Sequence, residues 1–158
     1  MPAANSPAES VADREIVMTR VIDAPRELVW EAYTNPSHIS QWYGPKGFTI
    51  TTHEMDVRVG GVWRFIMHAP DGTNFESRQD YIEVVRPERL VFLYGEREND
   101  PEAMDCSVTF TNQAGKTLIT QRMVFRTKAQ YEATIGFGAV ELGYQTLDKL
   151  AAHVAVMA

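Results

Sequence analysis

Strand-like runs follow one another through the middle of the chain at the spacing of β-hairpins. Between residues 48 and 126, runs rich in Val, Ile, Phe, Thr and Tyr are separated by turn segments at residues 69–72 (APDG), 86–89 (RPER) and 112–115 (NQAG). Turns of this length leave no room for the crossover that parallel neighbours need, so consecutive strands must pair antiparallel. The sequence therefore predicts an antiparallel sheet as the main element of the fold.

A further strand and two short helices precede these runs. Residues 15–23 (EIVMTRVID) predict the strand because they are rich in β-branched types. Residues 25–33 and 36–42 each begin with a proline, which is favoured at the first position of a helix, and Asn35 can cap the second of them. We therefore expect two short helices between the first and the second strand.

The C-terminal segment predicts one long helix. Thr127 followed three residues later by Gln130 has the form of a capping box, and no proline occurs from there to residue 156. An apolar stripe at helical spacing is formed by Ala139, Gly143, Leu147, Leu150 and Val154. A sheet cannot leave its apolar face bare, and only this helix, of about 25 residues, is long enough to cover it. The sequence thus predicts an α+β domain in which a curved antiparallel sheet of about seven strands wraps around the C-terminal helix and encloses an apolar cavity.

Composition and charge exclude several classes of function. The 158 residues suit a single domain, and the formal charge of −6 argues against a nucleic-acid surface, which needs a basic footprint. Cys106 is the only cysteine, so neither an intrachain disulfide nor a multi-cysteine metal site can form. His53 is not followed by a second histidine at the spacing of a zinc-binding HExxH motif. We expect no metal, no cofactor and no nucleic-acid partner.

The first 13 residues (MPAANSPAESVAD) predict a disordered tail because they are rich in Ala, Ser and Pro, and residues 14–158 are expected to form one domain. The tail lacks the basic start and apolar core of a secretory signal, and the chain contains no run of eighteen apolar residues. We expect a cytoplasmic protein without stable membrane insertion. The sequence leaves a homodimer open.

Aromatic and glycine residues supply the candidate ligand contacts. Alternation along residues 62–68 places three large apolar side chains on the face that is expected to line the cavity. The other candidates are aromatic residues of neighbouring strands, a tryptophan at the end of the second short helix that would act as a lid, and two glycines that would leave space beside the final helix. The predicted ligand-binding residues are Trp42, Trp63, Phe65, Met67, Tyr81, Phe92, Tyr94, Gly138 and Gly143. Ordinary packing of the core is the alternative role for each of them.

Polar residues give a weaker signal. A carboxylate on the final helix and a basic residue on a facing strand would form a polar handle or an acid–base pair, although such residues are more often solvated or paired with one another. The candidates are Arg64, His68, Arg78, Gln121, Arg122 and Glu141. We assign none of them a catalytic role.

A series of motifs in fixed order resembles the family of heat-shock-protein-90 ATPase activator homologues, in its single-domain form. These motifs are residues 24–25 (AP), 29–32 (VWEA), 35–36 (NP), 41–45 (QWYGP), 59–63 (VGGVW), 70–72 (PDG), 87–92 (PERLVF), 115–117 (GKT) and 147–150 (LDKL). The resemblance covers residues 14–153 and implies the helix-grip fold of the START-like, or SRPBCC, superfamily. Tyr144 follows Gly143 where relatives often have a tryptophan, and residues 78–80 (RQD) stand where relatives commonly have a glycine.

The resemblance implies a binding module for an apolar or aromatic small molecule or a lipid. Other members of the superfamily are polyketide cyclases or aromatases, so an enzyme that uses the cavity is the first alternative. A co-chaperone-like protein-interaction module is the second. An enzyme predicts an ionisable pair that opens into the cavity, a carrier predicts a mostly apolar cavity, and an interaction module predicts a filled core with an exposed apolar patch.

Overall fold

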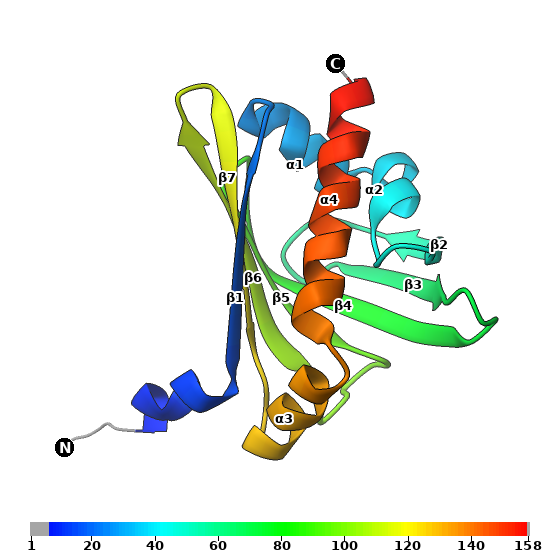
Figure 1. Ribbon diagram of the computed structural model, residues 1–158, viewed down its shortest axis with the longest axis vertical. Helices are drawn as coiled ribbons and strands as arrows, with labels where there is room; N and C mark the ends of the chain where they lie inside the picture. The colour runs from blue at the N-terminus through cyan, green and yellow to red at the C-terminus, as the bar shows by residue number, and fades with distance from the viewer. Residues whose placement is uncertain (1–6, 158) are drawn as a thin grey trace.

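One antiparallel sheet of seven strands carries the fold, and the helices α1, α2 and α4 lie against its inner face (Figure 1). The computed structural model describes residues 7–157. The strands are β1 (Glu15–Ile22), β2 (Thr49–Met55), β3 (Val62–His68), β4 (Asn74–Val85), β5 (Arg89–Gly95), β6 (Met104–Gln113) and β7 (Lys116–Val124). The helices are η2 (Pro7–Arg14), α1 (Arg26–Thr34), α2 (Pro36–Trp42), α3 (Lys128–Gly136) and α4 (Ala139–Met157).

The strand order in the sheet is β1-β7-β6-β5-β4-β3-β2, and every neighbouring pair is antiparallel. Strands β1 and β2 therefore lie at opposite edges, and α1 and α2 cross from one edge to the other (Figure 1). The predicted antiparallel sheet of seven strands, with two short helices between the first and the second, is confirmed.

The sheet is irregular at two places, between Thr52 and Glu54 in β2 and between Tyr81 and Glu83 in β4. Bulges of this kind bend a strand, increase its twist and redirect the neighbouring side chains. The second irregularity adjoins Tyr81, which faces the interior of the molecule and is 4 % exposed.

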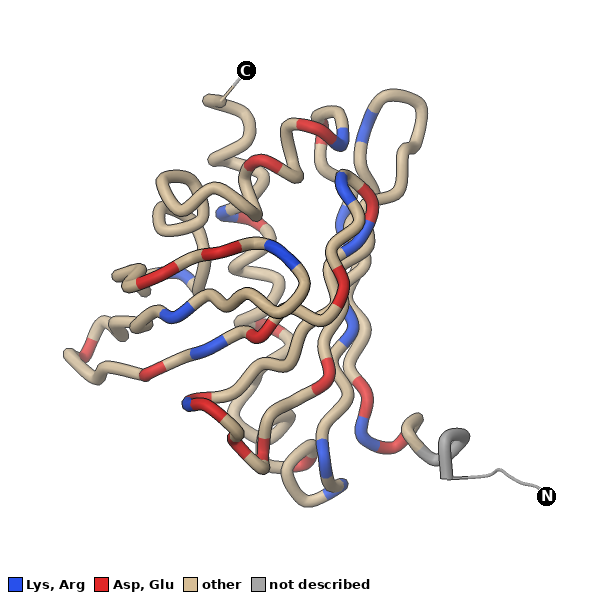
Figure 2. Tube along the Cα trace, turned by 180° about the vertical axis from the view of Figure 1, so that it is seen from behind, with Lys and Arg blue, Asp and Glu red and all other residues tan. Residues whose placement is uncertain are grey.

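Charged residues are spread along the strands of the sheet, with acidic and basic positions close to one another (Figure 2). Arg64 pairs with Glu54 at 2.8 Å and Arg89 pairs with Glu83 at 2.8 Å, and all four side chains are about half exposed. Exposed pairs of this kind each contribute at most about 1 kcal/mol to stability. The stability of the fold therefore depends on the apolar inner face.

The segment that was predicted to form one C-terminal helix forms two. Helix α3 ends at Gly136, and α4 begins at Ala139 after a break at Gly138, whose φ of +85° lies in the left-handed region. A residue in this conformation ends a helix, and glycine adopts it without steric cost. The predicted cap is present, since the side chain of Thr127 accepts a hydrogen bond from the Gln130 backbone N–H at 3.0 Å.

The two halves of α4 have different surroundings. In the C-terminal half, Leu147, Leu150 and Val154 are at most 1 % exposed and pack toward α1, α2 and the sheet. In the N-terminal half, Ala139 and Gly143 of the same stripe are only partly buried. The predicted stripe is therefore fully packed at one end of the helix and only partly covered at the other.

The prediction of a disordered tail before a single domain stays a prediction. Residues 1–6 lie outside the described residues, and residues 7–13 belong to η2, a 3-10 helix that ends at Arg14 beside α3. No helix in the described part of the chain is both long enough and apolar enough to cross a membrane.

Helices α2 and α4 are linked by a histidine pair, which makes the stability of the fold depend on pH. The Nδ1 atom of His38 lies 3.0 Å from Nε2 of His153, and burial together with the nearby His38 lowers the pKa of His153 below its usual 6.5. As the pH falls, His153 therefore takes up a proton in the unfolded chain before it does so in the folded protein. The neutral His153 contributes fully to the free energy of unfolding above pH 6.5, and this contribution is lost below that pH.

We expect urea unfolding of the protein to show lower stability at about pH 5 than at about pH 7.5, and His153→Gln to reduce this difference. His53→Gln, at an exposed position, serves as the control and should leave the difference unchanged. An unchanged difference in His153→Gln would assign the pH dependence to other groups.

Candidate ligand-binding site

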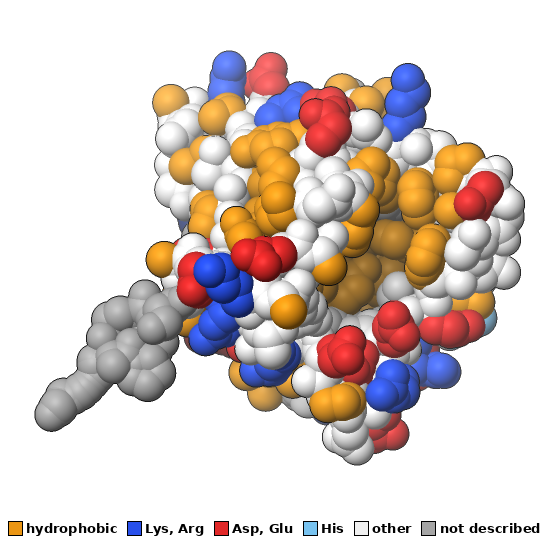
Figure 3. All heavy atoms as spheres, turned by 60° about the horizontal axis from the view of Figure 1, so that its bottom comes forward, with side chains coloured by type: hydrophobic (Ala, Val, Ile, Leu, Met, Phe, Trp, Pro, Cys, Tyr) orange, Lys and Arg blue, Asp and Glu red, His pale blue; other side chains and the backbone are white. Residues whose placement is uncertain are grey.

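A groove opens between α4 and the sheet, at the end of the molecule where α3 lies, and Figure 3 shows it as a hollow lined by apolar side chains. We call it the outer groove, and its volume is about 420 Å³. The large apolar side chains in its wall are Met18, Phe48, Met67, Phe75, Met104, Met123, Phe125, Phe137 and Leu142. Among the residues that the structure describes, no charged side chain lines it.

Contacts of α4 hold two walls of the outer groove in place. The Nζ atom of Lys149 donates to the backbone carbonyls of Pro45 and Phe48, both at 3.2 Å, and so fixes the loop between α2 and β2. On the other side, Gly143 lets α4 approach β1, because a Cβ atom at this position would lie 2.6 Å from the side chain of Met18. The groove is therefore bounded by a loop on one side and by close helix–strand contact on the other.

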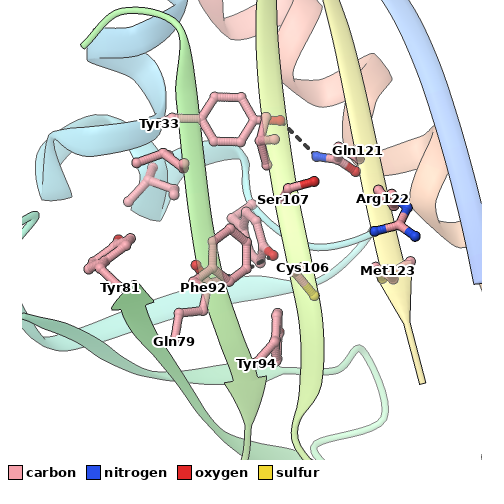
Figure 4. Close-up of a pocket in the computed structure, with 14 residues that line it drawn as sticks. Tyr33, Gln79, Tyr81, Phe92, Tyr94, Cys106, Ser107, Gln121, Arg122 and Met123 are labelled. Carbon is pink, nitrogen blue, oxygen red and sulfur yellow. Dashed lines mark hydrogen bonds between the residues drawn. The ribbon is translucent and has the colours of Figure 1, made fainter. Parts of the chain in front are cut away.

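A second hollow continues from the outer groove toward the core. This inner chamber has a volume of about 60 Å³, and Tyr33, Tyr81 and Phe92 line it (Figure 4). Tyr43, Tyr94, Gln121 and Met123 belong to the walls of both hollows. The outer groove and the inner chamber are thus adjacent spaces with common walls.

Two glutamines bind tyrosine hydroxyls in the inner chamber. The Nε2 atom of Gln121 donates to the Tyr33 hydroxyl at 2.7 Å (Figure 4), and Nε2 of Gln79 donates to the Tyr43 hydroxyl at 3.1 Å. The hydroxyl of Tyr81 has no hydrogen-bond partner within residues 7–157. The chamber therefore carries polar groups at defined points in walls that, like those of the outer groove, are mainly apolar.

Every phenol in the inner chamber remains protonated at neutral pH. Burial raises the pKa of Tyr33, Tyr43 and Tyr81 well above the usual 10, and it raises the pKa of Tyr94 to about 12. Burial likewise raises the pKa of the Cys106 thiol, with a smaller contribution from the charge of Asp105. The chamber can donate hydrogen bonds at neutral pH, but none of these groups can act as a general base there.

The sequence matches a known family over most of its length. Residues 23–155 match the family described as "Activator of Hsp90 ATPase homolog 1-like protein". The chain belongs to this family. Its curved sheet around a C-terminal helix is the helix-grip fold of the START-like superfamily, whose members commonly bind hydrophobic ligands.

Solved structures support the family fold at low sequence identity. A protein of Nitrosomonas europaea superimposes with a TM-score of 0.85 at 23% identity, covering 92% of this chain and 97% of that one. An AHSA1-like protein of Aeromonas hydrophila superimposes with a TM-score of 0.68 at 25% identity, covering 90% of this chain and 93% of that one. A comparison with curated proteins gives no match.

Five of the nine predicted ligand-binding residues lie in the walls of the two hollows of this family member. Met67 and Gly143 line the outer groove, Tyr81 and Phe92 line the inner chamber, and Tyr94 lines both. Alternation in β3, β4 and β5 placed four of them correctly on the inner face. That they contact a ligand stays a prediction.

The other four predicted residues lie outside the walls of both hollows. Trp63 and Phe65 are fully buried, and their rings stack on each other with centroids 3.7 Å apart. Trp42 donates from Nε1 to the carbonyl of Ala32 at 3.0 Å and is 1 % exposed, so it anchors α2 and does not form a lid. Gly138 lies at the break between α3 and α4, between two residues that line the outer groove.

The aromatic pair at the end of α2, Trp42 and Tyr43, was a candidate lid in the sequence, but only Trp42 was among the predicted ligand contacts, and Tyr43 is the one that lines both hollows. Its ring lies edge-on to Trp63 and Phe65, with centroid distances of 5.0 and 5.8 Å, and so separates both of them from the hollows. Because successive helical residues point about 100° apart, the residue after Trp42 faces the cavity when Trp42 faces the core. Its position after a buried tryptophan at the end of α2 was the available signal.

The candidate polar residues face outward with one exception. Arg64 and Arg122 pair with Glu54 and Glu15 on the outer face, Arg78 pairs with Asp80, and Glu141 is exposed. Gln121 alone has its side chain in the inner chamber. Within the described residues, no group of three or more His, Cys, Asp and Glu side chains is arranged to hold a metal ion.

Proposed function

We propose that this protein binds an uncharged apolar or aromatic small molecule, or a neutral lipid, in the outer groove. The observation that supports the proposal is a hollow of about 420 Å³ with no charged side chain in its described walls. This volume lies in the range of small-molecule sites, and such sites obtain affinity from apolar contacts and orientation from a few polar groups.

The alternatives receive less support from the same observations. A cyclase or aromatase would need an acid–base group near the substrate. Apart from Arg122, which pairs with Glu15, the ionisable groups in the described walls are tyrosines and a cysteine whose pKa values are raised far above neutrality. A protein-interaction module would use a filled core, whereas this core contains two adjoining hollows. Binding of a small molecule is the function that these features favour.

The charge at the mouth of the outer groove favours a neutral ligand over an anion. A surface hollow of about 290 Å³ shares Met67, Phe75 and Tyr94 with the groove and is lined by Glu76, Glu96, Asp100 and Glu102, with Arg97 as its single basic residue. A negatively charged head group would therefore meet repulsion at this opening.

We expect N-phenylnaphthylamine, a neutral fluorescent probe, to bind with a dissociation constant of about 10 µM or tighter. Anilinonaphthalene sulfonate, which has the same ring system and a negative charge, should bind more weakly. The difference should shrink in about 1 M NaCl, because salt screens the acidic mouth. Fluorescence titration measures both constants.

Each outcome of this titration bears on the proposal. Absence of binding by the neutral probe to the folded protein would contradict it. Tighter binding of the sulfonate would contradict the preference for a neutral ligand and would place the contact on a basic surface elsewhere.

A further inference from the structure

Tyrosine side chains are concentrated around the inner chamber. Four of the six tyrosines in the chain line a space of only about 60 Å³, and they come from separate elements: Tyr33 from α1, Tyr43 from the end of α2, Tyr81 from β4 and Tyr94 from β5 (Figure 4). Because a water molecule takes about 30 Å³ in the liquid, the chamber has room for one small functional group and not for a ring.

The pair formed by Tyr33 and Gln121 leaves one hydrogen-bond donor free. The hydroxyl of Tyr33 accepts from Gln121 at 2.7 Å, so its own O–H proton remains to be donated, and the described chain supplies no acceptor for it. If the amide of Gln121 were turned, the tyrosine would donate to its oxygen and an N–H of the amide would become free. Either arrangement offers the chamber a donor.

Tyr81 offers a second free donor. Its side chain lines the chamber and is 4 % exposed, and its hydroxyl forms no hydrogen bond with any described residue. A buried hydroxyl without a partner is destabilising, so such groups are normally satisfied by protein, water or a ligand. The irregular pairing next to Tyr81 in β4 is the kind of feature that redirects a side chain at a functional site.

We propose that the inner chamber binds the carbonyl oxygen of the ligand, and that one of its two free phenols, Tyr33 or Tyr81, donates the hydrogen bond. This inference rests on the proposed function, because the apolar body of the same molecule has to lie in the outer groove. Tyr43 and Gln121 belong to the walls of both spaces, so the two spaces adjoin at these side chains, and the carbonyl group of an apolar ligand would enter the chamber between them. The ligand class is therefore a neutral ketone, quinone or ester.

The charges around the chamber support a neutral acceptor group. Arg122 is the only charged residue that lines it, and its guanidinium is directed to Glu15 on the outer face of the sheet. Neither a carboxylate nor an ammonium group of a ligand would therefore find a counter-charge in the chamber. A carbonyl oxygen needs only donors, which the two phenols supply.

Three naphthalene probes of nearly equal size test the inference by displacing N-phenylnaphthylamine: acetylnaphthalene, ethylnaphthalene and the alcohol formed by reducing the ketone. We expect the ketone to bind about ten-fold more tightly than the ethyl compound and more tightly than the alcohol. The preference should be equal at about pH 6 and about pH 9, because the phenols stay protonated over this range.

Variants identify the donors. Tyr33→Phe and Tyr81→Phe each keep the ring; the variant that removes the donor should abolish the preference for the ketone, and the other should leave it unchanged. The affinity for ethylnaphthalene should not fall. Tyr144→Phe is the matched control, since its hydroxyl accepts from the Thr19 backbone N–H at 3.4 Å and lies outside both hollows.

The outcomes separate this inference from the proposed function. If the neutral probe binds but ketone and ethyl compound bind equally, water alone satisfies the phenols and the inference is wrong while the proposed function stands. Equal binding of ketone and alcohol would also overturn the assignment of a carbonyl group, because a hydroxyl oxygen would then accept from the chamber equally well. If neither N-phenylnaphthylamine nor any naphthalene binds, the proposed function itself fails.

Discussion

Replacing Thr146 with Trp is expected to weaken the binding of N-phenylnaphthylamine at least about ten-fold. Thr146 lines the outer groove from α4, and its hydroxyl bonds only to the carbonyl of Leu142 in the same helix, at 3.2 Å. The substitution therefore breaks no hydrogen bond between elements. Its indole would occupy the space in which the body of the ligand is expected to lie.

Ala152→Trp is the control for this substitution. Ala152 lies on the same helix at an exposed position, so an indole there changes helix composition and tryptophan content without entering the groove. Its dissociation constant should stay within about two-fold of the original, and circular dichroism should show both variants folded. A folded Thr146→Trp protein that binds the probe unchanged would show that the outer groove is not the binding site.

Much of the fold followed from local signals in the sequence because five of the six strand pairings join consecutive strands. Turn segments such as residues 69–72 connect neighbouring strands, and the alternation of residues 62–68 fixes which side chains face inward. The family motifs added the helix-grip arrangement. The break at Gly138 was less visible, since a glycine within a helical pattern can either be tolerated or end the helix.

The site could be predicted only in part, because depth in the core depends on contacts between distant segments. Trp63, Phe65 and Met67 share one face of β3, yet only Met67 reaches the outer groove. The first two are covered by Tyr43, which the fold brings against them from the end of α2. No periodicity within β3 contains this information.

Gln121 was among the candidate polar residues, but its role could not be predicted, for the same reason. Its position in β7 predicts an inward side chain, but its partner Tyr33 lies 88 residues earlier in the chain. The available signal was therefore a polar residue among the buried positions of a strand, but nothing in the sequence identified its partner. The structure shows which residues that lie far apart in the chain contact each other, and the sequence alone does not.

The second prediction of large effect compares two leucines of α4. Leu150→Ala is expected to lower the free energy of unfolding by about 2–5 kcal/mol, because Leu150 is fully buried and its removal leaves a cavity in a packed core. Leu142→Ala should cost about 1 kcal/mol, since Leu142 is only partly buried and already borders open space. Leucine and alanine are both strong helix formers, so the comparison isolates packing.

Urea unfolding of the two variants measures this difference, and the result bears directly on whether the groove is open without a ligand. Truncating a leucine adds the cost of a new cavity only where the surrounding side chains were packed. A small loss of unfolding free energy at Leu142 and a large one at Leu150 would therefore show that α4 borders the open groove at its N-terminal end and the packed core at its C-terminal end. Equal losses of several kcal/mol at both positions would mean that the sheet closes onto the N-terminal half of α4 in solution. The binding proposal would then need a groove that opens only when the ligand arrives.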